Sequence, residues 1–334
     1  MEFNSVAGET ESVFVSGGNG FIGSRVVRCL HDQGYQINCL LRASSDTSRL
    51  DGISYRRFNG DVRDADSMRD AIAASQYAIH LASLSAWHQL DGPALEDTII
   101  GGARNVLELA RQEQTQRVVI VSSILAINGT LSPRMIHEDD GYELTDPGMR
   151  YAHAKKAVED MVGEFTADGL EVIIVNPVET YGPEDHDMVT ACNLIDFLNN
   201  WPCLTTRGGT AITGVEEVAG AIVSALKRGN SGERYILGGD NLSIRELARL
   251  TLMIAGQKKP IVHIPLALLK VVIPMMMRLR LPPPIVPEML PYLGYYFFTD
   301  STKAVSELDY QPKSAVEVLT PVVKWLAETD RING

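Results

Sequence analysis

The sequence lacks the features of several protein classes, and these absences narrow its function. It has only four cysteines in 334 residues, and none of them is at CxxC spacing: Cys29, Cys39, Cys192 and Cys203. Their spacing and apolar neighbours favour reduced, buried thiols over disulfides or a metal site. We therefore expect a reducing, cytoplasmic compartment.

Basic blocks and long apolar runs are also missing. The 30 basic residues are scattered singly or in pairs among 42 acidic ones, for a net charge of −12, so a nucleic-acid surface is not expected. Residues 1–11 are acidic and lack the apolar core of a signal peptide, so we interpret them as a frayed lead-in. No uninterrupted apolar run reaches the roughly 20 residues of a membrane-spanning helix.

The clearest pattern in the chain runs from Val13 to Leu41. A short apolar strand (13–16) leads into the turn Gly17-Gly-Asn-Gly-Phe-Ile-Gly23, then a helix (24–33) and a second strand (35–41). Glycines at these positions permit a tight turn, a close approach of backbone to a pyrophosphate, and close packing of helix on sheet. The pattern predicts a dinucleotide-binding βαβ unit, and its alternative is a turn with only a structural role.

Strands and helices alternate through the first half of the chain. Strands are expected at 53–58, 77–82, 117–123 and 170–176, and helices at 65–74, 98–112 and 149–167. Several of these strands are apolar throughout, which is typical of a parallel sheet covered on both faces. The sequence therefore predicts an α/β fold with a doubly wound parallel Rossmann sheet.

The second half divides between this sheet and a smaller part. A helix at 211–228 and a strand at 233–239 are expected to rejoin the sheet. We predict a cofactor domain of residues 11–177 plus about 211–240. The discontinuous remainder, 178–210 plus about 241–330, is expected to bind substrate across the carboxyl ends of the strands.

The end of the second strand predicts the cofactor. An NAD site of this type places an acid there, whereas this chain has Arg42 followed by serines, with no acid before Asp46. A guanidinium suits a 2′-phosphate, so NADP(H) is preferred and NAD(H) stays open. The alternative for Arg42 is a solvated surface charge. Asp61 and Val62 follow the third strand, where the carboxylate could meet the adenine amine or stabilise an ordinary turn.

Tyr151 and Lys155 begin the long helix with one turn between them, so their side chains share a face. A nearby ammonium stabilises a phenolate, and we expect it to lower the tyrosine pKa toward neutrality. Tyr151 would then donate or accept a proton, while Ser122 or Ser123 at the preceding strand end would bind the same substrate oxygen. The alternative is a solvated helix face.

These motifs together resemble the extended short-chain dehydrogenases/reductases, also called the NAD(P)-dependent epimerase/dehydratase family. The resemblance covers about residues 12 to 326, and within the family it is nearest to dihydroflavonol-reductase-like proteins and hopanoid-associated sugar epimerases. It implies that Ser123 is the catalytic serine and Tyr151 the acid/base, while Lys155 binds the nicotinamide ribose and tunes Tyr151. The implied cofactor-binding residues are Gly17, Gly20, Phe21, Ile22, Gly23, Arg42, Asp61, Val62, Leu81, Ala82, Ser83, Lys155, Pro177 and Val178.

The substrate is least clear from the sequence. Residues 261–296 are strongly apolar, including Met275 to Met277 and Ile285 to Leu290. They could form core, a lid over an apolar substrate, or a weak contact with a membrane surface. We expect a mixed role, with one helical face packed and the other facing substrate.

The leading prediction is an NADP(H)-dependent reductase of a small to medium, apolar ketone or aldehyde. The alternatives are a nucleotide-sugar epimerase or dehydratase that retains its cofactor, and a cofactor-sensing protein without turnover. His80, His88 and His153 have no second ligand at suitable spacing, so no metal is expected. The only expected partner is a small-molecule substrate, and a homodimer stays open.

Overall fold

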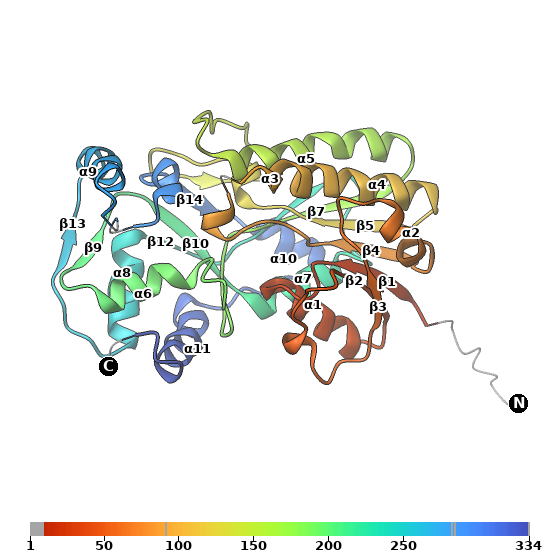
Figure 1. The fold of residues 1–334 in the computed structure, drawn as a ribbon, viewed down its shortest axis with the longest axis horizontal. Coiled ribbons are helices and arrows are strands. Elements are labelled where there is room, and N and C mark those ends of the chain that lie inside the picture. Colours follow the sequence, from red (N-terminus) through yellow and green to blue (C-terminus); the bar gives the residue numbers. More distant parts are fainter. Residues whose placement is uncertain (1–9, 91, 282, 284, 333–334) are drawn as a thin grey trace, which may run out of the picture.

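The computed structural model describes residues 10–90, 92–281, 283 and 285–332, so the lead-in expected at the N-terminus lies largely outside the described residues. Its centre is a seven-stranded sheet in which all the paired strands run parallel (Figure 1). In spatial order the strands are β11 (Arg234–Leu237), β7 (Glu171–Pro177), β5 (Arg117–Val121), β4 (Tyr77–His80), β1 (Ser12–Ser16), β2 (Gln36–Leu41) and β3 (Arg56–Asn59). The predicted parallel Rossmann sheet is therefore confirmed.

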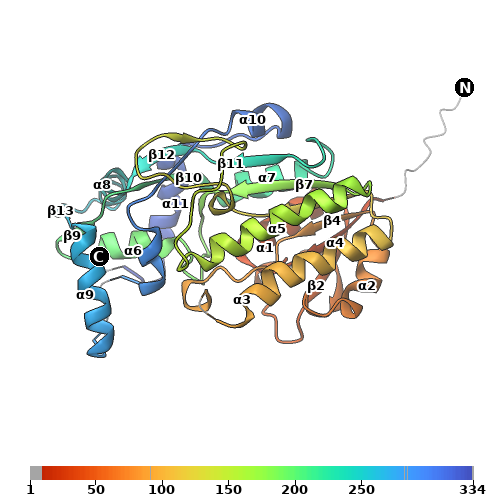
Figure 2. The ribbon, with the colours of Figure 1, turned by 90° about the horizontal axis from the view of Figure 1, so that it is seen from above.

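Helices cover both faces of this sheet, as Figures 1 and 2 show. On one face an apolar core joins the strands to α1 (Phe21–Asp32), α7 (Val215–Ser224) and α10 (Thr302–Leu308). On the other face a second core joins them to α2 (Asp66–Ala73), α4 (Gly102–Gln112) and α5 (Arg150–Ala167). Buried on both sides, the central strands need apolar side chains at successive positions, which explains the continuous apolar runs in the sequence.

The rest of the chain builds a smaller part beside the carboxyl ends of the strands. Its main sheet has the order β12 (Asp240–Ser243), β10 (Gly209–Gly214), β14 (Tyr296–Thr299) and β6 (Met135–Ile136), and β8 (Glu179–Tyr181) also pairs with β10. A two-stranded sheet joins β13 (Ile261–His263) to β9 (Cys203–Thr205). The helices of this part are α6 (Ala191–Asn199), α8 (Ile244–Ile254), α9 (Leu266–Arg278) and α11 (Ala315–Glu328).

Short helical turns complete the described chain. They are η1 (Ser48–Leu50), η2 (Trp87–Gln89), α3 (Ala94–Glu96), the π-helical η3 (Asp97–Gly101) that runs into α4, η4 (Ile124–Ala126) and η5 (Pro287–Tyr292). In the described residues no helix is both long and apolar enough to cross a membrane.

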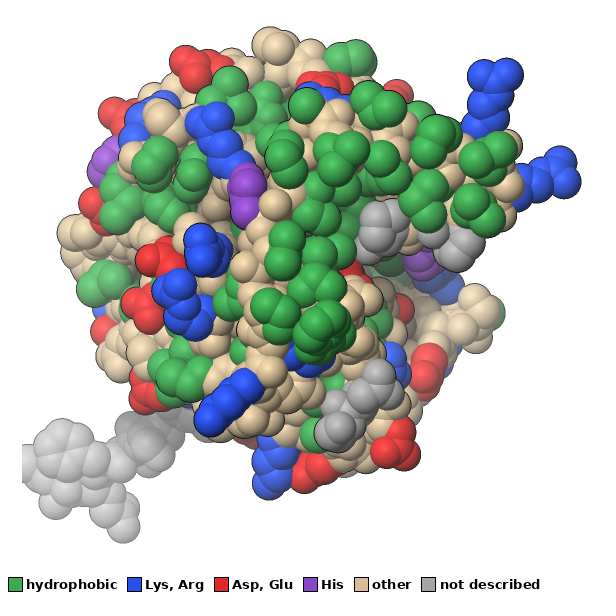
Figure 3. Space-filling view, turned by 90° about the vertical axis from the view of Figure 1, so that its left-hand side faces the viewer, with side chains coloured by type: hydrophobic (Ala, Val, Ile, Leu, Met, Phe, Trp, Pro, Cys, Tyr) green, Lys and Arg blue, Asp and Glu red, His purple; other side chains and the backbone are tan. Residues whose placement is uncertain are grey.

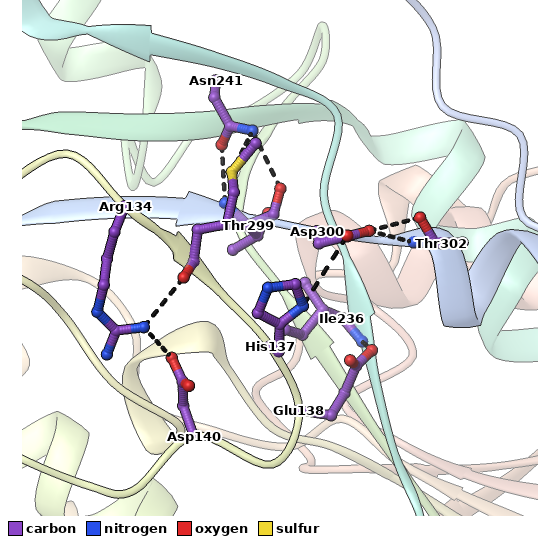
Figure 4. Close-up of polar contacts among 10 residues, drawn as sticks. Arg134, His137, Glu138, Asp140, Ile236, Asn241, Thr299, Asp300 and Thr302 are labelled. Carbon is purple, nitrogen blue, oxygen red and sulfur yellow. Dashed lines mark hydrogen bonds and ion pairs between the residues drawn. The ribbon is translucent and has the colours of Figure 1, made fainter.

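A segment from the first half of the chain is tied into the smaller part (Figure 4). Strand β6 pairs in parallel with β14, although some 160 residues separate them in sequence. Beside this pairing, the backbone N–H of Ile236 donates to Glu138 Oε1 at 3.0 Å. Asn241 receives a hydrogen bond from the backbone N–H of Thr299 at 2.8 Å and returns one to its carbonyl at 3.0 Å. These contacts connect β11, β12 and β14 around the inserted segment.

The helix predicted at 211–228 is wrong at its start. Residues 209–214 form β10 in the smaller sheet, and α7 begins only at Val215. Every residue of β10 is buried, so its short apolar run lacks the alternation that would distinguish a strand from a helical turn. The four cysteines are free. Cys39 and Cys203 are buried, as predicted, whereas Cys29 and Cys192 are only half-buried.

Candidate active site

A cavity of about 880 Å³ lies where the carboxyl ends of the central strands face the smaller part. All of the site residues predicted from the sequence line it, from Gly17 in the glycine turn to Val178 after β7. Open α/β sheets bind ligands at this edge. Folding thus gathers into one cavity residues that are spread over nearly half of the chain.

The glycine turn packs too closely for any larger residue. Gly17 has a φ of +73°, and a Cβ on it would lie 2.7 Å from the backbone nitrogen of Ala82. A Cβ on Gly23 would lie 2.0 Å from the carbonyl oxygen of Gly17. Helix α1 starts directly after Gly20, which has no side chain to cap the first-turn N–H groups. Uncapped N–H groups at a helix N-terminus beside a cavity fit a pyrophosphate, so this end of the cavity suits a dinucleotide.

Polar side chains that follow the second and third strands also line the dinucleotide region of the cavity. Arg42 follows β2, is exposed and lines the cavity. The Asp61 carboxylate accepts hydrogen bonds from the Arg63 side chain at 2.9 and 2.8 Å and from the Arg63 backbone N–H at 3.0 Å. The pKa of Asp61 falls to about 2, chiefly because of the hydrogen bond from Arg63. The carboxylate therefore stabilises the turn after β3, and because Asp61 also lines the cavity, the predicted contact with adenine stays a hypothesis.

Two arginines that line this region of the cavity were missed in the sequence. Arg63 lies two residues after Asp61, and Arg49 donates to the backbone carbonyls of Asn19 at 3.3 Å and Glu184 at 2.9 Å. No local motif marks either residue, because only the fold brings them to the cavity. Arg42, Arg49 and Arg63 outnumber Asp46 and Asp61 in the lining of this region, which favours an anionic ligand.

Tyr151, Lys155 and Ser123 meet at the middle of the cavity. Tyr151 lies in the first turn of α5, and Lys155 Nζ is 5.7 Å from the centroid of its ring. The ammonium donates to the carbonyl of Val121 at the end of β5, at 2.9 Å. The hydroxyl groups of Ser83 and Ser123 lie close enough to the Tyr151 hydroxyl to lower its pKa. The predicted shared face of Tyr151 and Lys155 is thus present, and it opens on the cavity.

The predicted direction of the tyrosine pKa is wrong in this environment. Burial raises the pKa of Tyr151 to about 12, and the opposing effects of the Ser83 and Ser123 hydroxyls are smaller. Burial also lowers the pKa of Lys155 to about 8, although Glu159 acts in the opposite direction. Desolvation of the phenolate is thus the dominant effect, and Lys155 is not among the groups that lower the pKa of Tyr151. Tyr151 is protonated at neutral pH and can donate a proton.

Glu159, a buried residue one helical turn after Lys155 in α5, was also missed in the sequence. It accepts hydrogen bonds from Ser122 Oγ and, at 2.6 Å, from Asn176 Nδ2. Arg234 Nε lies 2.8 Å from its other oxygen, while Asn176 also donates to the carbonyl of Ser123 at 2.9 Å. The available signal was its position four residues after Lys155, on the same face of α5. Because Ser122 donates to Glu159, Ser123 is the one of these two adjacent serines whose hydroxyl lies near Tyr151.

The substrate end of the cavity is largely apolar. Its apolar lining residues are Trp87, Leu90, Leu125, Phe197, Leu204, Ile264, Leu269, Ile285, Met289, Tyr292, Leu293 and Phe297. Ile285 and Met289 are among these residues, so the lid predicted from the sequence stays a hypothesis there. It is absent at Met275 to Met277, which do not line the cavity, and Met275 and Met277 are 52% and 53% exposed. The physical reason is that α9 buries Leu269 and Ile273 and turns these methionines to solvent.

Carboxyl groups interrupt this apolar lining. Glu179 in β8 lines the cavity and accepts a hydrogen bond from the Tyr181 hydroxyl at 2.8 Å. Burial raises the pKa of Glu179 to about 7. Asp196 in α6 also lines the cavity, and burial raises its pKa to about 6. Near neutral pH these side chains carry only part of their negative charge.

Glu179→Gln should therefore change how stability depends on pH. The pKa of Glu179 is about 7 in the folded state, against its usual 4.5. The protonated carboxyl therefore contributes its full stabilisation below about pH 4.5, and this contribution is lost as the pH rises through 7. Relative to wild type, the glutamine variant should gain about 1 to 3 kcal/mol in free energy of unfolding between pH 5 and 8. Urea unfolding across this range measures the difference.

The matched control is Glu328→Gln, at a side chain of α11 that is 61% exposed. Its stability relative to wild type should vary little between pH 5 and 8, because an exposed carboxylate is well solvated. A Glu179→Gln difference that is as flat with pH as this control would contradict a buried carboxyl at Glu179.

His80 and His153, two of the histidines considered in the sequence, have hydrogen-bonded partners. His80 is buried, and its Nδ1 lies 2.8 Å from Ser16 Oγ. Burial lowers its pKa to about 3, and the nearby Lys155 acts in the same direction. His153 Nδ1 lies 2.8 Å from the Tyr142 hydroxyl. Across the described part of the chain, no cluster of three or more His, Cys, Asp or Glu residues could hold a metal ion.

Comparison with known proteins gives the same picture. The model of the NAD dependent epimerase/dehydratase family matches residues 13–238. Sterol demethylase protein B of Methylococcus capsulatus is 26% identical over 96% of this chain and 100% of its own length. A Synechocystis protein provisionally named dihydroflavonol 4-reductase is 28% identical over 97% of both chains. The crystal structure of gox2253 superposes with a TM-score of 0.82 at 26% identity, covering 97% of this chain and 100% of that one.

The family model spans the whole sheet together with Ser123, Tyr151 and Lys155. The chain belongs to the NAD dependent epimerase/dehydratase family and is an NAD(P)-dependent oxidoreductase of the extended short-chain dehydrogenase/reductase type.

Proposed function

We propose that this protein is an NADP(H)-dependent reductase of a ketone or aldehyde on a small to medium, apolar substrate. The observation that carries the proposal is the position of Tyr151. Its hydroxyl lies near Ser123, its ring centroid is 5.7 Å from Lys155 Nζ, and the same cavity has a largely apolar end. Residues 11–177 with about 211–240 would bind the cofactor, and 178–210 with about 241–330 the substrate.

The chain's own residues would act on the substrate oxygen. When bound, the cofactor supplies the hydride that adds to the carbonyl carbon. Tyr151, protonated at neutral pH, donates its proton to the oxygen as negative charge develops there. Ser123 donates a hydrogen bond to the same oxygen and so orients it. Lys155, held by the carbonyl of Val121, positions the ribose and places a positive charge near Tyr151.

The charge of the substrate end favours a reductase over a nucleotide-sugar epimerase. A nucleotide sugar carries a diphosphate, which proteins bind with cationic side chains or helix N-termini. Among the described residues that line this end, Glu179, Asp187 and Asp196 are acidic and only Arg207 is a lysine or arginine. Arg207 already donates to the carbonyl of Leu131. Such a lining opposes a diphosphate and suits an uncharged substrate, and the name of one relative refers to a sterol.

Turnover distinguishes the three functions considered. The purified protein would be mixed with NADPH and, separately, with a panel of aliphatic, aromatic and polycyclic ketones and with UDP-sugars. A reductase consumes NADPH in proportion to the alcohol formed. An epimerase converts the sugar without net consumption of NADPH, and a sensor forms neither alcohol nor epimerised sugar. NADPH oxidation with an apolar ketone supports the proposal, and epimerised UDP-sugar without NADPH consumption would overturn it.

Ile285→Ala should raise KM for an apolar ketone because Ile285 lines the substrate end of the cavity. Removing its side chain exposes the substrate to water and deletes a contact, with an expected effect of about 1 to 3 kcal/mol, or roughly 5- to 160-fold. Steady-state kinetics give KM, and thermal unfolding checks the fold.

Met277→Ala is the matched control, because Met277 is 53% exposed and does not line the cavity. It should leave both KM and the melting temperature near the wild-type values. An unchanged KM in Ile285→Ala would remove the assigned contact with substrate.

A further inference from the structure

Helix α9 turns a row of large apolar side chains to solvent. Leu268 is 54% exposed, Val271 66% and Met275 52%, and their spacing of three and four residues places them on one face. Met277, Leu279 and Leu281 continue the exposed row at the end of the helix. We call these six residues the α9 patch. Figure 3 views this end of the molecule and shows apolar side chains gathered there, with Lys and Arg side chains projecting beside them.

The charge around the α9 patch is opposite to that of the whole protein. Residues 247–287 contain six lysines and arginines and no acidic residue, whereas the full chain has a net charge of −12. Lys270, Arg278 and Arg280 lie within or directly after α9, and all three are exposed. A helix with exposed Leu, Val and Met beside Lys and Arg is typical of helices that lie in a membrane interface.

We propose that the α9 patch docks the protein on an anionic lipid surface, with α9 lying along the bilayer. The apolar side chains would enter the acyl region, and Lys270, Arg278 and Arg280 would meet lipid phosphates. Helix α9 has 13 residues, too few to span a bilayer, so the contact is peripheral. The attraction of these basic residues to anionic headgroups exceeds the repulsion caused by the net negative charge of the protein, because the basic residues are concentrated at this one end.

The charges make a second copy of the chain a poor occupant. A two-fold dimer places the same patch on both sides of the interface. Lys270, Arg278 and Arg280 of one copy would then face the same cations of the other without an acidic residue between 247 and 287 to pair with them. A lipid surface supplies the negative charges that this region lacks.

The inner side of α9 connects this surface to the cavity. Leu269, next to the exposed Leu268, is buried and lines the substrate end, and so do Ile285 and Met289 beyond the helix. One helix therefore separates the proposed lipid surface from the apolar end of the cavity. Docking there would let an apolar substrate pass between the bilayer and the cavity without crossing water.

Flotation with lipid vesicles tests the docking. The full chain would be mixed with vesicles of phosphatidylcholine alone or of phosphatidylcholine with phosphatidylglycerol, at low and high salt. We expect binding to the anionic vesicles that weakens with salt and with loss of their charge. Arg278→Gln with Arg280→Gln should weaken binding about 25-fold, since each basic side chain near such a surface contributes about five-fold. Val271→Asp should weaken it at least about ten-fold, because it places a charge in the apolar contact.

Val316→Asp is the matched control, at an exposed valine of α11 (47%) outside the α9 patch. It should bind vesicles like wild type. Equal binding by Val271→Asp, or no vesicle binding by the wild type, would overturn the proposal. The proposal would also be overturned if the wild type sedimented as a dimer, Val271→Asp sedimented as a monomer, and neither protein bound vesicles. The measurements need neither substrate nor cofactor, so their failure is separate from failure of the proposed reductase activity.

Discussion

Tyr151→Phe should lower turnover by a factor of about 10² or more while leaving NADPH affinity nearly unchanged. Phenylalanine keeps the ring beside Lys155 but removes the hydroxyl that Ser83 and Ser123 surround. Burial raises the pKa of this hydroxyl to about 12, so the wild type holds the proton that the carbonyl oxygen needs across the neutral range. Steady-state turnover with an apolar ketone and titration with NADPH measure the two effects separately.

Tyr142→Phe provides the matched control for this change. Tyr142 is also bonded through its hydroxyl, 2.8 Å from His153 Nδ1, but it does not line the cavity. Its loss should cost a hydrogen bond worth about 1 kcal/mol of stability and leave turnover unchanged. Near-wild-type turnover in Tyr151→Phe, with the control equally active, would contradict the assigned role of Tyr151.

The parts of the fold that were predictable are those with a local cause. The strand at 13–16 is apolar because it is buried on both faces, and the glycines after it are needed by a turn in which a Cβ would meet backbone. Tyr151 and Lys155 share a face because of helical geometry alone. Each of these features depends on neighbours within a few residues in the chain. They can therefore be predicted from a single sequence.

The missed features depend on contacts between distant segments. Strand β10 is fully buried and pairs with β12, β14 and β8, none of which is adjacent to it in sequence. Glu159 is buried because Ser122, Asn176 and Arg234 provide its partners, and a glutamate in a helix otherwise predicts an exposed face. The raised pKa of Tyr151 was missed for the same reason, since the extent of its burial is a property of the fold.

Arg42→Ala should weaken NADPH binding by roughly one to two orders of magnitude, because a hydrogen bond to a charged group contributes about 1.5 to 3 kcal/mol. NADH lacks the 2′-phosphate and should bind the variant almost as well as the wild type. Arg42 is exposed at the cavity, as a phosphate contact requires. Titration of both cofactors into both proteins gives the four dissociation constants.

Arg56→Ala and Arg63→Ala distinguish the role of Arg42 in NADPH binding from the roles of two other nearby arginines. Arg56 lies over the ring of Phe58, 4.5 Å from its centroid, and does not line the cavity, so its loss should change neither constant. Arg63 lines the cavity, but its guanidinium already makes two hydrogen bonds to Asp61. A selective loss of NADPH affinity in Arg63→Ala would transfer the phosphate contact to Arg63. Equal affinity of the wild type for NADH and NADPH would leave both arginines without that role and would make NAD(H) an equally good cofactor.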